Sequence, residues 1–390
     1  MTTSTIEKVK LPPETVGFSS CKKTCVEYFA GMGLVRLGLE RTGWQVVFAN
    51  DWSSEKFDMY RAYFEDAEKH YSVGDIFGIQ PSSVPETLLA TVSFPCIDLS
   101  LAGSLKGIRG NYSGAFWGFI AILKGQKDSP PLILLENVPG WLTSNGGKDF
   151  RLTIQALNDS GYACDVFVIN ATHFVPQSRR RVFVVGSQIS EPNNDILRLA
   201  RRSKSLRTKA VDRAIAANHD LAWHFLDIPE LPKQSQLSLS DIVEDIPLSD
   251  QRWWNKAEVE RHIAMMSATN LTHLEALKMQ PACSYRTMYR RVRHGQQRAE
   301  IRKDNIAGCL RTAKGGSSRQ MLVSVGKGRI DMRLVTPREC ARLQGVPDSY
   351  PLPEKVNQAL TGLGDAVCVP VITWIGENVL NPAIAGMLNR

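Results

Sequence analysis

The sequence predicts an α/β fold: a mainly parallel sheet covered by helices, followed by a second, smaller lobe. Three observations lead to this prediction. Short apolar runs alternate with helical stretches from residue 23 to about Gly186. Polar side chains directly follow several of these runs, and from about Ser187 the chain becomes polar and basic. Continuous apolar runs are typical of parallel strands, because helices cover both faces of such a sheet.

The chain opens with a predicted βαβ unit. Lys23 to Phe29 reads as a strand, Leu34 to Thr42 has the apolar spacing of a helix, and Gln45 to Asn50 reads as a second strand. Gly31 and Gly33 lie between the first strand and the helix, where the absence of a Cβ lets the backbone approach a ligand closely. Such a glycine pair also suits a plain tight turn, so it predicts a pocket only together with the residues that follow.

Asp51 and Trp52 directly follow the second predicted strand. A carboxylate there can accept hydrogen bonds from both hydroxyls of a ribose, and an indole offers a flat face to an adenine ring. Arg36 stands where the usual dinucleotide fingerprint has its third glycine. We therefore expect a nucleoside pocket that departs from that fingerprint, with an ordinary core position as the alternative for Trp52.

Later strands of the predicted sheet end in chemically active groups. Cys96 follows Pro95 at the end of one apolar run, and Glu136 closes another. Arg179 and Arg181 project to one face of an extended segment, because side chains alternate along a strand. A thiol can act as a nucleophile and a carboxyl group can transfer protons. The plain alternatives are a buried structural cysteine, a solvated acid and a basic strand edge.

The composition limits the classes of protein to consider. The 390 residues and 43% apolar content suffice for a full catalytic core and a second lobe, and the net charge of +8 favours a polyanionic partner. The eight cysteines form no paired Cys-x-x-Cys motif, so we expect a reducing cytoplasm and neither disulfides nor a metal. We expect residues 1–20 to be a flexible tail. No apolar run approaches the roughly 20 residues of a membrane span, so no membrane association is expected.

In their order along the chain, these motifs resemble those of the DNA (cytosine-5)-methyltransferase family, over roughly residues 24 to 371. The blocks that carry the resemblance are Phe29-Ala30-Gly31-Met32-Gly33, Pro95-Cys96, Glu136-Asn137-Val138, Gln177-Ser178-Arg179-Arg180-Arg181, the segment from Arg333 to Gly345, and Gly364-Asp365-Ala366-Val367. The resemblance implies a Rossmann-like S-adenosylmethionine-dependent methyltransferase sheet with a smaller, irregular target-recognition domain. Residues 21–188 would form the catalytic domain, completed by 354–390, and residues 189–353 would form the target-recognition domain.

The resemblance also implies a mechanism for methylating carbon 5 of cytosine. Cys96 would add to carbon 6 of the ring, which makes carbon 5 nucleophilic. Glu136 would contact ring nitrogen 3 and the exocyclic amine with a raised pKa, and Arg179 and Arg181 would hold the base carbonyl and flanking groups. Because these groups cannot reach a stacked base, the target cytosine must be flipped out of the duplex. Ser100 would support the nucleophile loop or contact a phosphate, unless it caps the next helix.

The cofactor implied by the resemblance is S-adenosyl-L-methionine. The residues that the family pattern assigns to it are Phe29, Gly31, Gly33, Asp51, Trp52, Asp75, Ile76, Pro95 and Asp365. The first three would line its amino-acid end, Asp51 and Trp52 would hold the nucleoside, and Asp75 would accept from the adenine amine unless it caps a turn. The family commonly has Gly-Asn where this chain has Gly364-Asp365. An aspartate can accept from the cofactor's ammonium group but cannot donate as an amide does.

The partner implied by the resemblance is double-stranded DNA. Residues 285–302 interleave arginine with tyrosine, which suits phosphate contacts, and from them we single out Arg290, Arg291 and Arg293. A later stretch that contains glycine carries Arg319 and Gln320, whose side chains suit the edges of guanine and adenine. We expect these two residues to contribute to sequence specificity.

The predicted function is methylation of cytosine within a specific short DNA sequence by a cytoplasmic monomer, the protective half of a bacterial restriction-modification pair. A cognate restriction endonuclease would act on the same site without binding the enzyme. Two alternatives stay open. A tRNA cytosine-5 methyltransferase shares the catalytic motifs, but its Cys-Phe-Thr motif is not found here. A non-catalytic DNA-binding protein on this scaffold is disfavoured, because Cys96, Glu136, Arg179 and Arg181 are all present.

Overall fold

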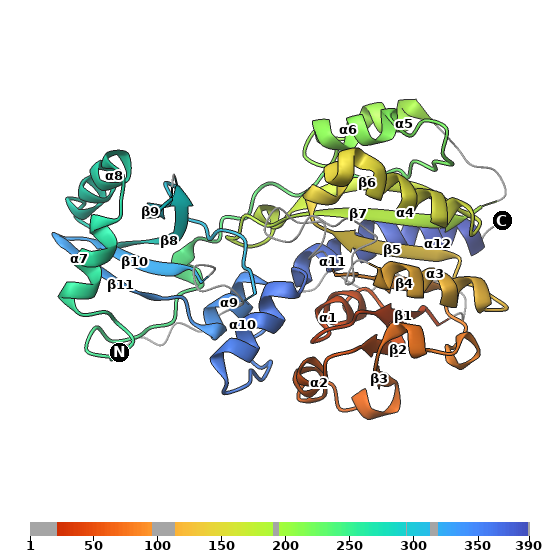
Figure 1. Cartoon of the computed structure of the whole chain (residues 1–390), viewed down its shortest axis with the longest axis horizontal. Coiled ribbons are helices and arrows are strands. Elements are labelled where there is room, and N and C mark those ends of the chain that lie inside the picture. The colour runs from red at the N-terminus through yellow and green to blue at the C-terminus, as the bar shows by residue number, and fades with distance from the viewer. Residues whose placement is uncertain (1–21, 96–113, 190–194, 294, 313–318, 389–390) are drawn as a thin grey trace, which may run out of the picture.

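The protein folds into two lobes joined by a narrower region (Figure 1). The computed structural model describes residues 22–95, 114–189, 195–293, 295–312 and 319–388. The larger lobe contains the first part of the chain together with the C-terminal helices, and the smaller lobe holds a separate sheet. The predicted N-terminal tail, residues 1–20, lies outside the described residues.

A seven-stranded sheet forms the core of the large lobe, in the order β3-β2-β1-β4-β5-β7-β6. Its strands are β1 (Thr24–Tyr28), β2 (Gln45–Asp51), β3 (Tyr71–Val73), β4 (Leu89–Val92), β5 (Leu132–Asn137), β6 (Tyr162–Asn170) and β7 (Arg180–Gln188). β1 to β5 pair in parallel, which confirms the predicted α/β class. β7 is antiparallel to both neighbours. Its direction relative to β6 follows from the short connection, because residues 171–179 are fewer than the dozen or so that a parallel crossover needs.

The order of the strands determines where a ligand can bind. The chain runs outward from β1 through β2 to β3, and then returns to the other side of β1 to form β4 and β5. The order therefore reverses between β1 and β4, and open α/β sheets bind ligands outside the carboxyl ends of the strands at such a point. β4 and β5 are buried along their whole length, as the continuous apolar runs predicted.

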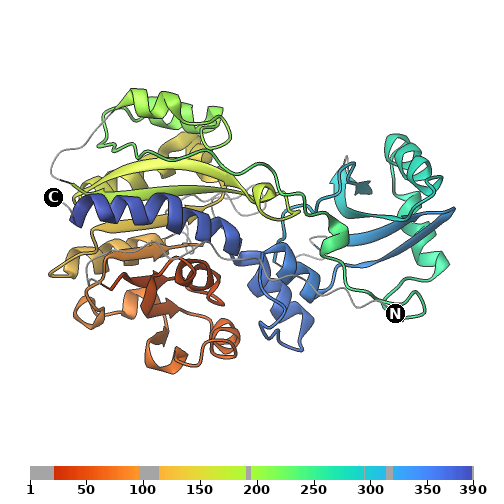
Figure 2. The same ribbon diagram turned by 180° about the vertical axis from the view of Figure 1, so that it is seen from behind.

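Helices cover both faces of this sheet (Figures 1 and 2). One face carries α1 (Leu34–Glu40), α2 (Ser54–Arg61), α11 (Val369–Ile375) and α12 (Asn381–Leu388), and the other carries α3 (Ala115–Gly125) and α4 (Lys148–Asn158). α11 packs closely on α1, since a Cβ at Gly38 would lie 2.6 Å from Ile372 Cβ. The helical stretch 356–388 is long and apolar enough to cross a membrane, but 72% of its apolar window is buried inside the protein, as in a core helix.

The smaller lobe is built on a four-stranded antiparallel sheet, in the order β11-β10-β8-β9, which confirms the expected second unit. The strands are β8 (Ser284–Arg293), β9 (Gln296–Ile301), β10 (Met321–Gly326) and β11 (Arg329–Leu334), and the helices packed on them are α7 (Lys256–Ala264) and α8 (Ala268–Lys278). Leu274, Met288, Val323 and Met332 belong to its separate core. α9 (Pro337–Leu343) and α10 (Val356–Asp365) lie between the lobes (Figure 1).

The chain adds further elements to the large lobe before it reaches the small one. α5 (Ile196–Arg201) and α6 (Lys209–Ala216) pack beside β6. Arg202, just after α5, forms a bidentate pair with Asp165 of β6, with N···O distances of 2.7 and 2.6 Å. The large lobe thus extends past residue 188, where the sequence analysis placed a boundary, because β6 carries a buried carboxylate that needs a partner.

We expect Arg202→Met to lower the free energy of unfolding by about 3–5 kcal/mol, because it leaves the Asp165 carboxylate unpaired in the interior. The two side chains are only 1% and 0% exposed. Urea titration of the purified protein measures the loss. Arg151→Met is the matched control: it breaks the Arg151–Asp220 pair, which joins the same segment to α4. The two side chains are 41% and 50% exposed, so we expect little or no loss of stability. Equal losses would contradict this account of the boundary.

Candidate active site

A largely buried ion pair lies at the carboxyl edge of the large sheet. Arg181, near the start of β7, has its Nε 2.8 Å from Oε1 of Glu136, near the end of β5. The two residues meet because β5 and β7 are antiparallel neighbours. Burial raises the pKa of Glu136, while Arg181 and Arg179 act against this shift. The carboxyl group therefore takes up a proton more readily than an exposed glutamate does.

Arg179 has a different environment from Arg181. Its guanidinium group is buried and donates to three backbone carbonyl oxygens, those of Leu310 (3.0 Å), Gly364 (3.0 Å) and Ala366 (2.6 Å). The sequence analysis assigned both arginines to the cytosine. In the structure, Arg179 joins the start of β7 to the connection between β9 and β10 and to the end of α10. It is placed to position Arg181, and Arg181 contacts Glu136.

Cys309 belongs to the same cluster, although the sequence analysis did not single it out. Its Sγ lies 3.3 Å from Nη1 of Arg179 and 3.9 Å from Nη1 of Arg181. Burial would raise the pKa of this thiol, but the two guanidinium groups outweigh burial and lower it. No local pattern reveals the contact, because Cys309 and Arg179 are 130 positions apart in the chain.

The predicted nucleophile, Cys96, and Ser100 lie outside the described residues, but the strand end that leads to them is described. Asn137, at the end of β5, donates from Nδ2 to the carbonyl oxygen of Phe94 at 3.3 Å. Pro95 is half-buried. The hydrogen bond holds the start of the Pro-Cys segment beside the end of β5, and thus near the ion pair.

The loop between β1 and α1 has the backbone geometry for which glycine is suited. Phe29, Gly31 and Gly33 have positive φ angles of 59°, 56° and 81°. A Cβ at Gly33 would lie 2.6 Å from the ring of Phe64, so packing also requires glycine there. A Cβ at Gly31 would meet nothing nearer than Cδ of Lys56, 3.9 Å away. The backbone at Gly31 therefore borders open space.

Asp51 fixes this loop from the end of β2. Its Oδ2 accepts from the Gly31 N–H and its Oδ1 from the Ser53 N–H, both at 3.0 Å. Each oxygen keeps a second lone pair, so the carboxylate can accept further hydrogen bonds.

Trp52, the next residue, is 67% exposed, which excludes the core position that the sequence analysis kept as its alternative.

The remaining predicted cofactor residues lie near these loops. Asp75 is exposed and its Oδ1 accepts from the Phe77 N–H at 3.1 Å, so it caps the short helix η2 (Ile76–Gly78), whose Ile76 is buried. Asp365 forms an ion pair of 3.1 Å with Lys56, a residue that the sequence analysis missed. Within the described part of the chain, no cluster of His, Cys, Asp and Glu is arranged to hold a metal ion.

The arginines predicted to contact phosphates lie on β8. Arg291 and Arg293 are exposed, and both pair with Glu300 of β9, at 3.7 and 3.1 Å. Arg290 is half-buried and, by the alternation of side chains along a strand, projects from the opposite face of the sheet. The two outer arginines therefore share a carboxylate that a DNA phosphate would have to replace.

The two residues predicted to read bases directly precede β10. Arg319 is half-buried. Gln320 is buried, and its amide accepts from the Gly308 N–H and donates to the Gly308 carbonyl oxygen, each at 2.8 Å. The Gln320 amide thus joins two backbone segments of the protein, and it faces Gly308 rather than solvent.

A second buried carboxyl group lies beneath the loop after β1. Glu27, on β1, is 1% exposed. Burial raises the pKa of Glu27 to about 8, although the nearby Arg36 acts against the shift. Glu27 is therefore largely protonated in the folded protein at neutral pH.

We expect Glu27→Gln to remove a pH dependence of stability. The folded-state pKa of about 8 exceeds the ordinary value of 4.5, so between these values the native state keeps a proton that the unfolded state loses. The wild-type free energy of unfolding should therefore fall, relative to the variant, as the pH rises from about 5 to about 8, by at most about 1.4 kcal/mol per pH unit. Urea titrations of both proteins across this range measure the trend. A difference that does not change with pH would mean that Glu27 is ionised in the folded protein.

Comparisons with known proteins identify relatives along nearly the whole chain. The profile of the family described as C-5 cytosine-specific DNA methylase matches residues 23–381. The chain is 28% identical over 354 residues to the type II methyltransferase M.NgoBI of Neisseria gonorrhoeae, covering 89% of this chain and 90% of that protein. It is 24% identical over 355 residues to the type II methyltransferase M.HhaI of Haemophilus parahaemolyticus, covering 91% and 93%.

Solved structures share the fold. The methyltransferase EhMeth of Entamoeba histolytica has a TM-score of 0.59 at 13% identity, over 93% of this chain and 99% of that chain. The Dnmt2 methyltransferase of S. pombe has a TM-score of 0.54 at 16% identity, over 92% and 98%. These likenesses confirm the predicted methyltransferase-type sheet. Since the family profile spans residues 23–381, the chain belongs to the C-5 cytosine-specific DNA methylases and is a DNA (cytosine-5) methyltransferase.

Proposed function

We propose that the chain transfers a methyl group from S-adenosyl-L-methionine to carbon 5 of cytosine within a short, specific double-stranded DNA sequence. The observation that carries this proposal is the Glu136–Arg181 pair beside the start of the Pro95-Cys96 segment. The reaction needs a nucleophile for carbon 6 and a proton-exchanging group at ring nitrogen 3. Cys96 and Glu136 would supply them at the same edge of the sheet.

In the proposed reaction, the Cys96 thiolate adds to carbon 6 of a cytosine flipped out of the duplex. Glu136 holds a proton at ring nitrogen 3, and Arg181 orients Glu136 and donates to the base carbonyl. S-adenosyl-L-methionine would supply the methyl group: carbon 5 bonds to it through the electron pair released by the addition, and the bond from the methyl group to sulfur breaks, so that S-adenosylhomocysteine leaves. A base then removes the carbon-5 proton, and the Cys96 sulfur leaves as the double bond between carbons 5 and 6 re-forms. The raised pKa of Glu136 favours this role.

The described residues fit the proposed cofactor. The open backbone at Gly31 leaves room for its amino-acid end, and the free lone pairs of Asp51 can accept from ribose hydroxyls. The exposed indole of Trp52 offers a face to adenine. These groups lie at the carboxyl ends of β1 and β2, where α/β sheets bind nucleotides.

The names of the relatives support a role in restriction-modification. We propose that methylation protects host DNA from a cognate restriction endonuclease, and that the enzyme acts as a monomer in the bacterial cytoplasm. The net charge of +8 suits a DNA substrate. A tRNA substrate has less support, because the relatives at 24–28% identity are named type II methyltransferases.

Covalent trapping tests the proposed reaction. The protein and cofactor are incubated with random-sequence duplex DNA that contains 5-fluorocytosine, and adducts are resolved by denaturing electrophoresis. We expect a stable adduct, because fluorine at carbon 5 cannot be removed as a proton. Cys96→Ala should abolish the adduct, and Glu136→Gln should slow its formation by about 100-fold or more. Sequencing of the trapped fragments then gives the recognition site.

The matched control is Cys283→Ala, which removes an exposed thiol just before β8 and should form the adduct at the wild-type rate. An adduct that persists in Cys96→Ala would assign the nucleophile to another cysteine. Trapping on tRNA but not on DNA would favour the second substrate class. DNA binding without any adduct would favour the non-catalytic alternative.

The paired arginines of β8 should contact phosphates without regard to sequence. We expect Arg291→Gln and Arg293→Gln each to weaken binding to all duplexes alike and to reduce the salt slope of log K by about 1. Fluorescence anisotropy at several salt concentrations measures both effects. Glu300→Gln should strengthen binding, because it removes the carboxylate that occupies both guanidinium groups. A loss confined to one sequence would instead identify a base contact.

A further inference from the structure

Lys56 is a half-buried lysine that the proposed mechanism does not use. It lies in the first turn of α2, and its side chain is 19% exposed. Its ammonium group is 3.1 Å from Oδ2 of Asp365, and its Cδ is 3.9 Å from the position of a Cβ on Gly31. Burial would lower the pKa of Lys56, but Asp51 and Asp365 outweigh burial and raise it. A charged lysine therefore stands between the loop after β1 and the end of α10.

The charges around Lys56 are unequal. Two carboxylates, those of Asp51 and Asp365, act on one ammonium group. The Asp51 carboxylate already accepts from the N–H groups of Gly31 and Ser53, whereas Asp365 contacts Lys56 directly and is 45% exposed. The resembled family commonly has a neutral asparagine at the position of Asp365. This chain thus places an additional anion at the site, with a cation beside it.

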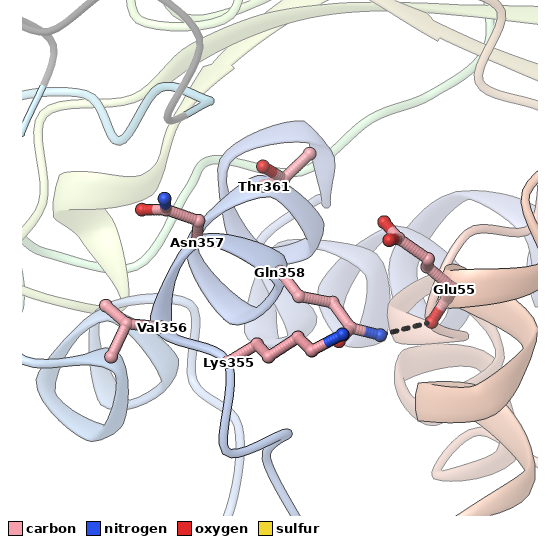
Figure 3. Close-up of a pocket in the computed structure, with 6 residues that line it drawn as sticks. All are labelled: Glu55, Lys355, Val356, Asn357, Gln358 and Thr361. Atoms are coloured by element: carbon pink, nitrogen blue, oxygen red, sulfur yellow. Dashed lines mark hydrogen bonds between the residues drawn. The ribbon is translucent and has the colours of Figure 1, made fainter.

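A cavity of about 460 Å³ opens between α2 and α10, the two helices that carry Lys56 and Asp365 (Figure 3). Its lining residues are Glu55, Lys355, Val356, Asn357, Gln358 and Thr361. Lys56 and Asp365 are not among them, so the cavity separates the two helices without containing the pair. Gln358 bridges the helices by donating to the Glu55 carbonyl oxygen at 3.3 Å (Figure 3).

We propose that Lys56 binds the α-carboxylate of S-adenosyl-L-methionine while Asp365 binds its α-ammonium group, so that the pair selects the zwitterionic end of the cofactor. This inference rests on the proposed use of that cofactor. The Lys56 stem lies against the open backbone of Gly31, on the side where the family pattern expects the amino-acid end. When the cofactor binds, the ion pair between Lys56 and Asp365 is replaced by two ion pairs, one between Lys56 and the α-carboxylate and one between Asp365 and the α-ammonium group. Each charged group therefore keeps a partner of opposite charge.

A purely structural role for Lys56 leads to a different expectation. Lys56 would then only neutralise Asp365, and its removal would not distinguish a ligand that has the amino-acid end from one that lacks it. Removing Asp365 as well would also restore the charge balance.

Isothermal titration calorimetry on the full-length protein separates the two roles. The probes are S-adenosylhomocysteine, which carries the zwitterionic end, and 5′-methylthioadenosine, which has the same nucleoside without that end. We expect Lys56→Met to weaken S-adenosylhomocysteine binding at least about tenfold, as the loss of a charge-assisted hydrogen bond does, and to leave 5′-methylthioadenosine binding unchanged. Unchanged binding of the second probe also shows that the variant is folded. Lys69→Met removes an exposed lysine of η1 (Ala67–Lys69) and is the matched control, expected to bind both probes like the wild type.

Two further measurements complete the test. If Lys56→Met with Asp365→Asn still binds S-adenosylhomocysteine weakly, the proposal holds, whereas recovery of wild-type affinity assigns Lys56 to charge balance alone. In the wild type, decarboxylated S-adenosylmethionine should bind at least about tenfold more weakly than S-adenosyl-L-methionine, and equal affinities would overturn the inference. A wild-type protein that binds none of these nucleosides would overturn the proposed cofactor itself.

Discussion

The arrangement of the site depends on the hydrogen bonds that the buried guanidinium group of Arg179 donates. This group donates to the carbonyl oxygens of residues 310, 364 and 366, which come from the connection between β9 and β10 and from the end of α10. A buried cation is costly unless its donors are satisfied, so these segments must be in place together. The start of β7, which carries Arg181, is thereby fixed relative to both. Asp365 lies between two of the carbonyl groups, so the cofactor side belongs to the same unit as the Glu136 side.

Two buried glutamines extend this unit to α9 and α10. Gln177 donates to the carbonyl oxygen of Leu343 (2.7 Å) and accepts from the N–H of Leu310 (3.1 Å), and Gln344 donates to the carbonyl oxygen of Leu363 (2.8 Å). A neutral amide both donates and accepts, so it can link backbone groups in the interior without burying a charge. Hydrogen bonds depend on direction as well as distance. These hydrogen bonds therefore fix the segments that carry Leu310, Leu343 and Leu363 relative to the start of β7 more tightly than apolar contact would.

Local patterns predicted much of the large lobe but little of what joins its parts. The first strand, helix and second strand were predicted to within about two residues, because apolar periodicity and glycines are local signals. Asp51 and Glu136 could be found because each ends an apolar run. The direction of β7 and the packing of α5 and α6 depend on contacts with other strands, which a short stretch of sequence does not reveal. The same holds for Lys56 and Cys309, whose neighbours in space are distant in sequence. It also holds for Gln320, whose side-chain amide is hydrogen-bonded to the backbone of Gly308.

The core of the large lobe combines side chains from both ends of the chain, such as Cys25 and Val46 with Ile372 and Ile384. A nascent chain leaves the ribosome N-terminal end first. One face of the sheet formed by the first strands therefore stays incompletely covered until α11 has been synthesised and packs on Gly38. The small lobe, whose helices and strands fall within residues 256–334, is synthesised as one continuous unit and can form earlier. The core of the large lobe is therefore complete only after α11 and α12 have been synthesised, and a chain that stops before α10 lacks both this cover of the sheet and Asp365.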